Sequence, residues 1–306
     1  MGEFGLIARI TAGLGSNEAT LLGPGDDAAI VRTSDGRVVA STDLLIENRH
    51  FRRDWSSAND IGHKAAAKNF ADIVAMGAVP TALLVGFGTP GDLEVEWVDG
   101  FTAGLREECG VVGAVVVGGD VVASDSITIA ITALGDLQGR DPVTLDGARV
   151  GDVVAFAGRL GWAGAGLAVL GRGFRSPVQI VNAHRRPEPP YAQGVEAALI
   201  GASAMTDVSD GLVADLGNIA AASNVRIDLS AKLLPVPLKL KEVAAALNTD
   251  PMSWVLTSGD DYALVATFAK LVELPAAWTV IGAVSEGSGV RVDGRVWPSA
   301  GHEHFR

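Results

Sequence analysis

Aspartates stand beside short apolar segments at several places along this chain. The apolar run 111–117 is followed by Gly118-Gly119-Asp120, and the β-rich run 37–43 ends in Ser41-Thr42-Asp43. Carboxylates at the ends of apolar strands can converge on one rim of a sheet, where like charges repel unless cations neutralise them. The pattern predicts a sheet-containing protein with an acidic site. Further aspartates in comparable motifs are Asp26, Asp27, Asp72, Asp207, Asp210, Asp260 and Asp261.

The spacing of apolar residues predicts both helices and strands. Residues 3–14 have the period of an amphipathic helix, and two β-rich runs at 28–32 and 37–43 flank a Ser-Asp-Gly turn that predicts a hairpin. A hairpin in the first half favours an α+β fold with a mixed sheet over a doubly wound parallel sheet. Further helices are expected at 59–76, 94–109, 164–170 and 212–222, and further strands at 81–87, 111–117, 127–134, 153–156, 204–208, 225–229 and 263–268, with two more within 278–297.

A polar segment rich in glycine and proline interrupts this pattern at residues 135–142. Segments of this composition are typical of domain boundaries. The chain of 306 residues is long enough for two domains. We therefore expect one domain over residues 1–137 and a second over 138–306.

The charge balance is acidic, with 24 basic and 36 acidic side chains and a net charge of −12. This balance argues against nucleic-acid binding and against attachment to a membrane surface. The single cysteine, Cys109, excludes an internal disulfide framework. The first residues lack a signal-peptide pattern, and the longest apolar stretches, such as 160–171, are shorter than the roughly 18 residues that span a bilayer. The expected location is the cytoplasm.

Several common catalytic motifs are absent. No P-loop and no protein-kinase signature occurs, and no serine or cysteine nucleophile has a convincing partner. The segment Gly86–Gly91 matches Gly-x-Gly-x-x-Gly, but Pro90 removes a backbone donor that a dinucleotide phosphate would need. We interpret this segment as a strand-to-helix turn, and His302-Glu303-His304 as a surface tail rather than a metal site.

Each aspartate motif alone is compatible with a structural role. Asp210 can cap the helix that follows it, Asp26 and Asp27 can form a turn, and an exposed Asp72–Lys68 pair would contribute only about 0.3–0.5 kcal/mol. Together the motifs favour a site for several Mg²⁺ ions, because Mg²⁺ binds one or two carboxylates each plus water and phosphate oxygens. Adjacent glycines allow backbone amides to approach phosphates.

Taken in order, these motifs resemble the thiamine-monophosphate kinases, within the aminoimidazole ribonucleotide synthetase superfamily. The resemblance covers nearly the whole chain. It is carried by Gly25-Asp26-Asp27-Ala28-Ala29, Ser41-Thr42-Asp43 with His50-Phe51, Asn69-Phe70-Ala71-Asp72, Gly118-Gly119-Asp120, Asp207-Val208-Ser209-Asp210-Gly211 and Ser258-Gly259-Asp260-Asp261-Tyr262.

The resemblance implies a homodimer whose N-terminal sheets pair into a shared barrel, with a C-terminal α/β domain that completes the active site. It implies ATP as co-substrate, thiamine phosphate as acceptor and several Mg²⁺ ions, with no catalytic side chain. The implied Mg²⁺ ligands are Asp27, Ser41, Thr42, Asp43, Asp72, Asp120, Asp207 and Asp210. The implied ATP contacts are Gly119, Asp120 and Ser209, and the implied thiamine phosphate contacts are His50, Asp260 and His302.

Three positions depart from the family pattern. Leu145 stands where the family often has an arginine that faces the nucleotide, Asp260 where it often has glutamate, and His302 where it often has a larger aromatic residue. Two other function classes remain open. One is another ATP-dependent synthetase of the superfamily, and the other is a non-catalytic nucleotide-binding relative. A selenophosphate synthetase would typically need a reactive N-terminal cysteine, and none precedes Cys109.

Overall fold

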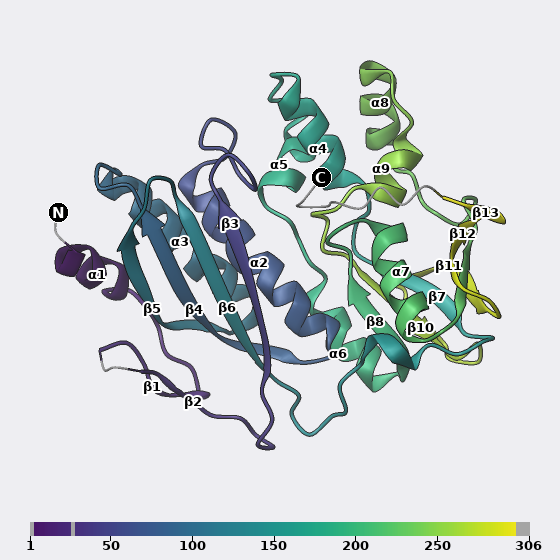
Figure 1. The fold of residues 1–306 in the computed structure, drawn as a ribbon, viewed down its shortest axis with the longest axis horizontal. Coiled ribbons are helices and arrows are strands. Elements are labelled where there is room, and N and C mark those ends of the chain that lie inside the picture. Colours follow the sequence, from purple (N-terminus) through teal and green to yellow (C-terminus); the bar gives the residue numbers. More distant parts are fainter. Residues whose placement is uncertain (1–2, 26–27, 298–306) are drawn as a thin grey trace. The chain divides into compact units, whose positions relative to one another are not determined.

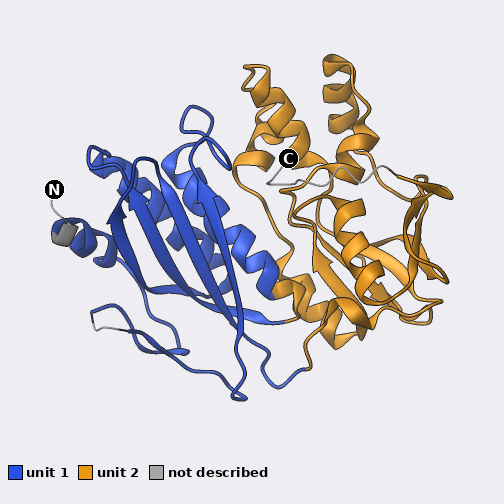
Figure 2. Cartoon of the chain, in the orientation of Figure 1, with its two compact units in different colours: residues 1–73, 78–140 blue, residues 74–77, 141–306 orange. Residues whose placement is uncertain are grey.

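The computed structural model describes residues 3–25 and 28–297. The chain forms two compact units, one of residues 1–73 and 78–140 and the other of residues 74–77 and 141–306 (Figure 2). The boundary expected after residue 137 stays a prediction; the first unit ends at residue 140. Within the described ranges, no helix is both long enough and apolar enough to cross a membrane.

The first unit is built on a four-stranded mixed sheet with strand order β3-β6-β4-β5 (Figure 1). β4 and β5 are parallel, and the β3–β6 and β6–β4 pairs are antiparallel. The elements are α1 (Glu3–Thr11), β1 (Thr20–Leu22), β2 (Ile30–Val31), β3 (Val39–Ile46), α2 (Ala58–Ala75), β4 (Val79–Thr89), α3 (Val95–Val112), β5 (Val115–Ala123) and β6 (Thr128–Asp136).

The hairpin predicted from residues 28–43 is wrong. β2 pairs with β1, whereas β3 pairs with β6. The intervening turn is bound to the end of β6 instead, because the Ser34 amide and hydroxyl both donate to Asp136 at 2.9 Å. A Ser-Asp-Gly turn between two β-rich runs therefore does not determine which strands pair.

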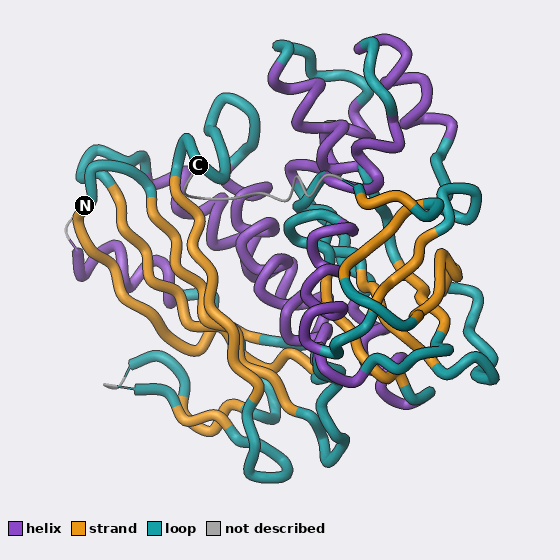
Figure 3. Tube along the Cα trace, turned by 45° about the vertical axis from the view of Figure 1, so that its right-hand side comes forward, coloured by secondary structure: helices purple, strands orange, loops and turns teal. Residues whose placement is uncertain are grey.

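Helices α2 and α3 cover one face of this sheet (Figures 1 and 3). Phe87 of β4 stacks on Trp97 and Phe101 of α3, with ring centroids 6.1 and 5.4 Å apart. The two helices approach so closely that a Cβ at Gly62 would lie 2.2 Å from the Phe101 carbonyl oxygen, and one at Gly104 would lie 2.1 Å from that of residue 59. These two glycines are thus required by packing.

The opposite face of the sheet, which we call the open face, carries side chains that are exposed in the single chain. Strand alternation places Leu44, Leu84 and Val122 there, with exposed fractions of 51%, 37% and 52%. The helix-covered face carries Ile129 and Ile131 of β6, both fully buried. The sheet is therefore buried on one side only.

The second unit contains a seven-stranded mixed sheet with strand order β13-β12-β9-β11-β7-β10-β8. Only the β12–β9 pair is parallel in this sheet. Residues 278–297 form three strands rather than the two that were expected there. The elements are η1 (Leu145–Gly147), β7 (Val153–Ala157), α4 (Trp162–Gly171), α5 (Val178–Arg185), α6 (Tyr191–Leu199), β8 (Ala202–Asp207), α7 (Leu212–Ala222), β9 (Arg226–Leu229), α8 (Leu238–Leu247), α9 (Pro251–Thr257), β10 (Leu264–Phe268), β11 (Trp278–Ser285), β12 (Gly289–Val292) and β13 (Arg295–Val296).

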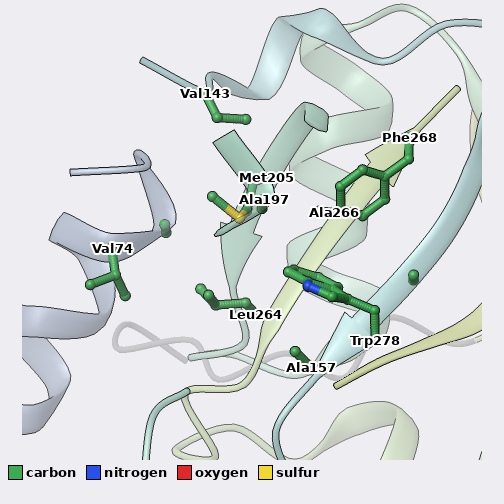
Figure 4. Close-up of a cluster of buried hydrophobic side chains, with 11 residues drawn as sticks. Val74, Val143, Ala157, Ala197, Met205, Leu264, Ala266, Phe268 and Trp278 are labelled. Atoms are coloured by element: carbon green, nitrogen blue, oxygen red, sulfur yellow. The ribbon is translucent and has the colours of Figure 1, made fainter. Parts of the chain in front are cut away.

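The core of the second unit includes the last turn of α2 (Figure 4). Val74 lies there with Ala197 of α6 and Met205 of β8, and a Cβ at Gly194 would lie 2.2 Å from the Val74 carbonyl oxygen. Phe268 meets Trp278 edge-on, with ring centroids 5.2 Å apart. This core supports β8, which leads into residues 207–211, and β10, which follows residues 258–262.

Candidate functional site

In the first unit, β3 and α2 bring three of the predicted metal ligands together. The Ser41 hydroxyl donates a 2.6 Å hydrogen bond to Oδ2 of Asp72. Ser41 and Asp43 are two residues apart on β3 and therefore point to the same, helix-covered face. We call Ser41, Asp43 and Asp72 the β3–α2 cluster.

The β3–α2 cluster contains two carboxylates and one neighbouring lysine, Lys68. The pKa of Asp72 is raised to about 6, first by burial and also by the negative charge of Asp43, against the opposing effects of the Ser41 hydrogen bond and Lys68. Lys68 Nζ lies 3.3 Å from Oδ2 of Asp43. One lysine thus partly compensates two carboxylates. Two acidic oxygens with a neighbouring hydroxyl are also a donor set that Mg²⁺ accepts.

Thr42 is not part of this cluster. Its side chain lies on the open face, where its hydroxyl donates to the Ile131 carbonyl oxygen at 3.0 Å and accepts from the Thr132 hydroxyl at 3.1 Å. The structure therefore does not bring the Thr42 hydroxyl to Asp43 or Asp72.

Gly119 and Asp120 lie on β5, at the other edge of the same sheet. Gly119 is in register with Val85, Val85 with Ile131, and Ile131 with Asp43. Two strands therefore separate β3 from β5, which corresponds to roughly 14 Å. A single metal ion in one chain cannot bind both Asp43 and Asp120.

Close packing explains why residue 119 is glycine, since a Cβ there would lie 2.0 Å from the Val85 carbonyl oxygen. Asp120 is exposed, and Gly86, its partner in the β4–β5 pair, lies on the open face. Together with Gly88 and Ala130 these two residues line a hollow of about 330 Å³. Asp120 is thus accessible to a ligand or to another chain on that face.

His50 lies in the tight turn that follows β3. Its Nδ1 accepts a 3.0 Å hydrogen bond from the Ile46 amide. Because that nitrogen is an acceptor, the proton of the neutral imidazole is on Nε2. His50 can therefore donate a hydrogen bond from Nε2.

In the second unit, backbone hydrogen bonds connect the two motifs at residues 207–211 and 258–262. The β8–β10 ladder, in which Asp207 is opposite Leu264, continues past the strand ends. The Tyr262 amide donates to the Val208 carbonyl oxygen at 3.0 Å, and the Asp260 amide donates to that of Ser209 at 2.9 Å. The structure therefore brings Asp207, Ser209, Asp210 and Asp260 into one region, which we call the β8–β10 cluster.

Two buried carboxylates support this cluster, and the sequence did not single out their roles. Asp215 Oδ2 accepts from the amides of Asp210 and Gly211, both at 3.0 Å. The pKa of Asp215 is raised to about 7, first by burial and then by the negative charge of Asp210. Asp261 likewise accepts hydrogen bonds from the amides of Gly161 and Ala163 at the start of α4. An aspartate in such a motif can accept hydrogen bonds from backbone amides, as Asp215 and Asp261 do, or it can bind a ligand. Hydrogen-bond geometry distinguishes the two roles.

Two predicted site residues, Asp27 and His302, lie outside the described residues. Leu145 is in η1 and 37% exposed. No group of three or more His, Cys, Asp or Glu side chains within residues 3–25 and 28–297 is arranged to hold a metal ion. The β3–α2 cluster supplies two carboxylates, Asp43 and Asp72, which matches the one or two that Mg²⁺ takes from protein.

Comparison with known proteins gives consistent matches along the chain. Residues 25–137 match the family model "AIR synthase related protein, N-terminal domain", and residues 149–295 match "AIR synthase related protein, C-terminal domain". The chain is 48% identical to thiamine-monophosphate kinase from Mycobacterium tuberculosis H37Rv, over all of this chain and 92% of the relative. It is 35% identical to the Aquifex aeolicus enzyme, over all of this chain and 98% of the relative.

Solved structures agree with the sequence matches. The structure described as AaThiL complexed with AMPPCP and TMP superposes with a TM-score of 0.83 at 31% identity, covering 99% of this chain and 97% of that one. A hydrogenase maturation protein HypE in complex with ATP superposes with a TM-score of 0.73 at 21% identity, covering 92% and 86%. The latter likeness shows the fold alone.

Proposed function

The chain belongs to the thiamine-monophosphate kinase family, and from this premise we propose that it transfers the γ-phosphoryl group of ATP to thiamine phosphate, giving ADP and thiamine diphosphate. The observation that carries this proposal is the β3–α2 cluster, in which the Ser41 hydroxyl is hydrogen-bonded to Asp72 and a single lysine, Lys68, is paired with Asp43. Bound Mg²⁺ would neutralise the polyanionic ATP and the anionic acceptor as they approach each other.

We propose that Ser41, Asp43 and Asp72 hold metal in the first unit, and that Asp207 and Asp210 do so in the second. Oxygen donors of this kind suit Mg²⁺, and the raised pKa of Asp72, caused first by its burial, fits a carboxylate that ionises fully when a cation is present. Asp27 and Thr42 remain predicted metal ligands, and Gly119, Asp120 and Ser209 remain predicted ATP contacts.

The chemistry needs no general base from the protein. A phosphate monoester has a second pKa near 6, so the acceptor oxygen is largely ionised at pH 7. The side chains instead have to bind the two substrates and orient them for transfer. His50 can donate from Nε2 to a phosphate oxygen, and the carboxylate of Asp260 can interact with the cationic thiazolium ring of thiamine. His302 stays a predicted contact of the same substrate.

We propose direct in-line transfer without a phosphoenzyme. A phosphorylated aspartate would be the main rival, but it would remove a carboxylate from the metal sites. Direct transfer requires both substrates to be bound together and inverts a chiral γ-phosphoryl group. Parallel lines in a double-reciprocal analysis, or retention at phosphorus, would contradict direct transfer and leave the kinase activity standing.

We further propose that the protein is a homodimer formed through the open face, as a barrel of two sheets. Asp43 and Asp120 are too far apart in one chain to share an ion, because two strands, β6 and β4, lie between β3 and β5. Thr42 and Asp120 both lie on the open face, at opposite edges of the sheet. A two-fold partner that covers this face can bring its own β5 edge toward Thr42. The cytoplasmic location stays a prediction.

The test is a product assay with ATP, Mg²⁺ and thiamine phosphate. Thiamine diphosphate is expected together with ADP. Release of inorganic phosphate without thiamine diphosphate would favour another synthetase of the superfamily. Binding of ATP without turnover of any acceptor would favour a non-catalytic relative.

A further inference from the structure

Asp261 is a buried carboxylate that caps a helix distant in sequence. Its Oδ2 accepts from the Gly161 amide at 2.5 Å, and its Oδ1 accepts from the Ala163 amide at 2.7 Å. These amides belong to the start of α4, whose N-cap residue, Gly161, has no side chain and a φ of 82°. Amides at a helix start need an acceptor from elsewhere, and Asp261 supplies it.

The start of α4 is also packed tightly against the segment that leads into the Asp260 loop. A Cβ at Gly161 would lie 2.9 Å from the Val255 amide nitrogen, and one at Gly164 would lie 2.3 Å from the Ser258 Cβ. Because no side chain fits between them, α4 and residues 255–258 are packed in direct contact. Asp261, at the end of the loop that follows these residues, is hydrogen-bonded to the start of the same helix.

The loop between these attachments has a backbone that its residues do not favour. Asp260 has a φ of 64° and Tyr262 a φ of 50°, both in the left-handed region. Residues other than glycine adopt this backbone region only rarely, and they do so where the surrounding structure holds them in it. Asp261 stands between these two residues, so its two hydrogen bonds act on the strained part of the loop.

The same loop orients the Asp260 side chain. The Tyr262 hydroxyl donates a 2.9 Å hydrogen bond to Oδ1 of Asp260. The position of the Tyr262 ring depends on its backbone, which is next to Asp261. A continuous path of contacts thus leads from the first turn of α4 through Asp261 and Tyr262 to Asp260.

We propose that Asp261 is a positioning residue that holds the Asp260 carboxylate where it binds thiamine phosphate, an inference that rests on the proposed function. Asp261 does not itself contact the substrate in this account. Burial raises the pKa of Asp261 to about 7, an effect that its two amide hydrogen bonds oppose. A carboxyl group that is costly to bury is consistent with a role beyond filling space.

The test compares the isosteric variant Asp261→Asn with Asp250→Asn. Asp250 is a matched control, because it also caps a helix of the same unit, accepting from the Met252 amide at 3.0 Å, but it is exposed at the start of α9. Asp261→Asn should raise KM for thiamine phosphate about tenfold and leave KM for ATP within about twofold. Asp250→Asn should change neither constant, because an asparagine caps a helix start about as well as an aspartate.

A double-mutant cycle separates positioning from general destabilisation. If Asp261 acts through Asp260, adding Asp261→Asn to Asp260→Asn should raise KM for thiamine phosphate no further. Additive effects, or an unchanged KM in Asp261→Asn, would overturn the proposal. If Asp261→Asn does not fold, Tyr262→Phe tests the last contact of the path, and a normal KM there would also overturn it.

Failure of the proposed function would look different. In that case the wild-type protein would form no thiamine diphosphate, or Asp260→Asn alone would leave KM for thiamine phosphate unchanged. The wild type and the Asp260→Asn variant are therefore measured first, and the positioning role is judged only against their values.

Discussion

Lys68 Nζ lies 3.3 Å from Oδ2 of Asp43, so a protein cation sits beside the carboxylate that is proposed to bind metal. Replacing it by Lys68→Met leaves Asp43 and Asp72 without this countercharge. We expect a lower melting temperature without Mg²⁺ and a larger rise on adding Mg²⁺ than in the wild type. Differential scanning fluorimetry over a Mg²⁺ titration measures both. An unchanged Mg²⁺ response would contradict a metal site at this cluster.

The Mg²⁺ response should also depend on pH. The pKa of Asp72 is raised to about 6, mainly by burial, and metal binds the ionised carboxylate. As the pH falls through 6, protons compete with Mg²⁺, so the metal-induced rise in melting temperature should be smaller at pH 5 than at pH 8. The Asp72→Asn variant should lose this dependence. Equal responses of the wild type at both pH values would exclude Asp72 as a ligand.

Removing either carboxylate should affect turnover far more than folding. Asp43→Asn and Asp72→Asn should each lower kcat/KM by about 100-fold or more, which corresponds to about 2.7 kcal/mol. Their melting temperatures should stay near that of the wild type, because each change keeps the shape of the side chain and both side chains are only partly buried. Asp54→Asn serves as the control, since Asp54 is an exposed partner of Arg52. Near-normal turnover at saturating Mg²⁺ would contradict the assignment.

The proposed dimer can be disrupted on the open face. Leu44 is 51% exposed there, and Leu44→Glu should give a particle of half the mass with an unchanged circular dichroism spectrum. Leu238→Glu, at a site in α8 that is 71% exposed, is the matched control and should stay dimeric. Light scattering at micromolar concentration reads the mass. A wild-type particle of 31.4 kDa, the mass of one chain, would contradict the dimer.

Much of this arrangement was predictable because its signals are local. Apolar periodicity placed most helices and strands, and the aspartate motifs identified both clusters. Strand pairing was less accessible, because the choice between β3–β2 and β3–β6 depends on contacts such as Ser34 to Asp136, about a hundred positions apart. The same holds for Asp215 and Asp261, whose acceptor roles become visible only when α7 and α4 are in place.

The sheet also shows why motif order alone cannot assign a shared ion. Asp43 and Asp120 have equivalent sequence contexts, each at the end of an apolar run. They nevertheless belong to opposite edge strands, and Thr42 points away from its neighbour Asp43 because side chains alternate along a strand.

The most direct test of the account follows the phosphoryl group itself. The wild-type enzyme is incubated with thiamine phosphate, Mg²⁺ and ATP that carries ¹⁸O on the non-bridging γ-oxygens, and the products are analysed by mass spectrometry. Direct transfer predicts thiamine diphosphate that retains all of these labelled oxygens, with no label in inorganic phosphate. Label that appears in inorganic phosphate, with thiamine phosphate left unconverted, would contradict the kinase activity.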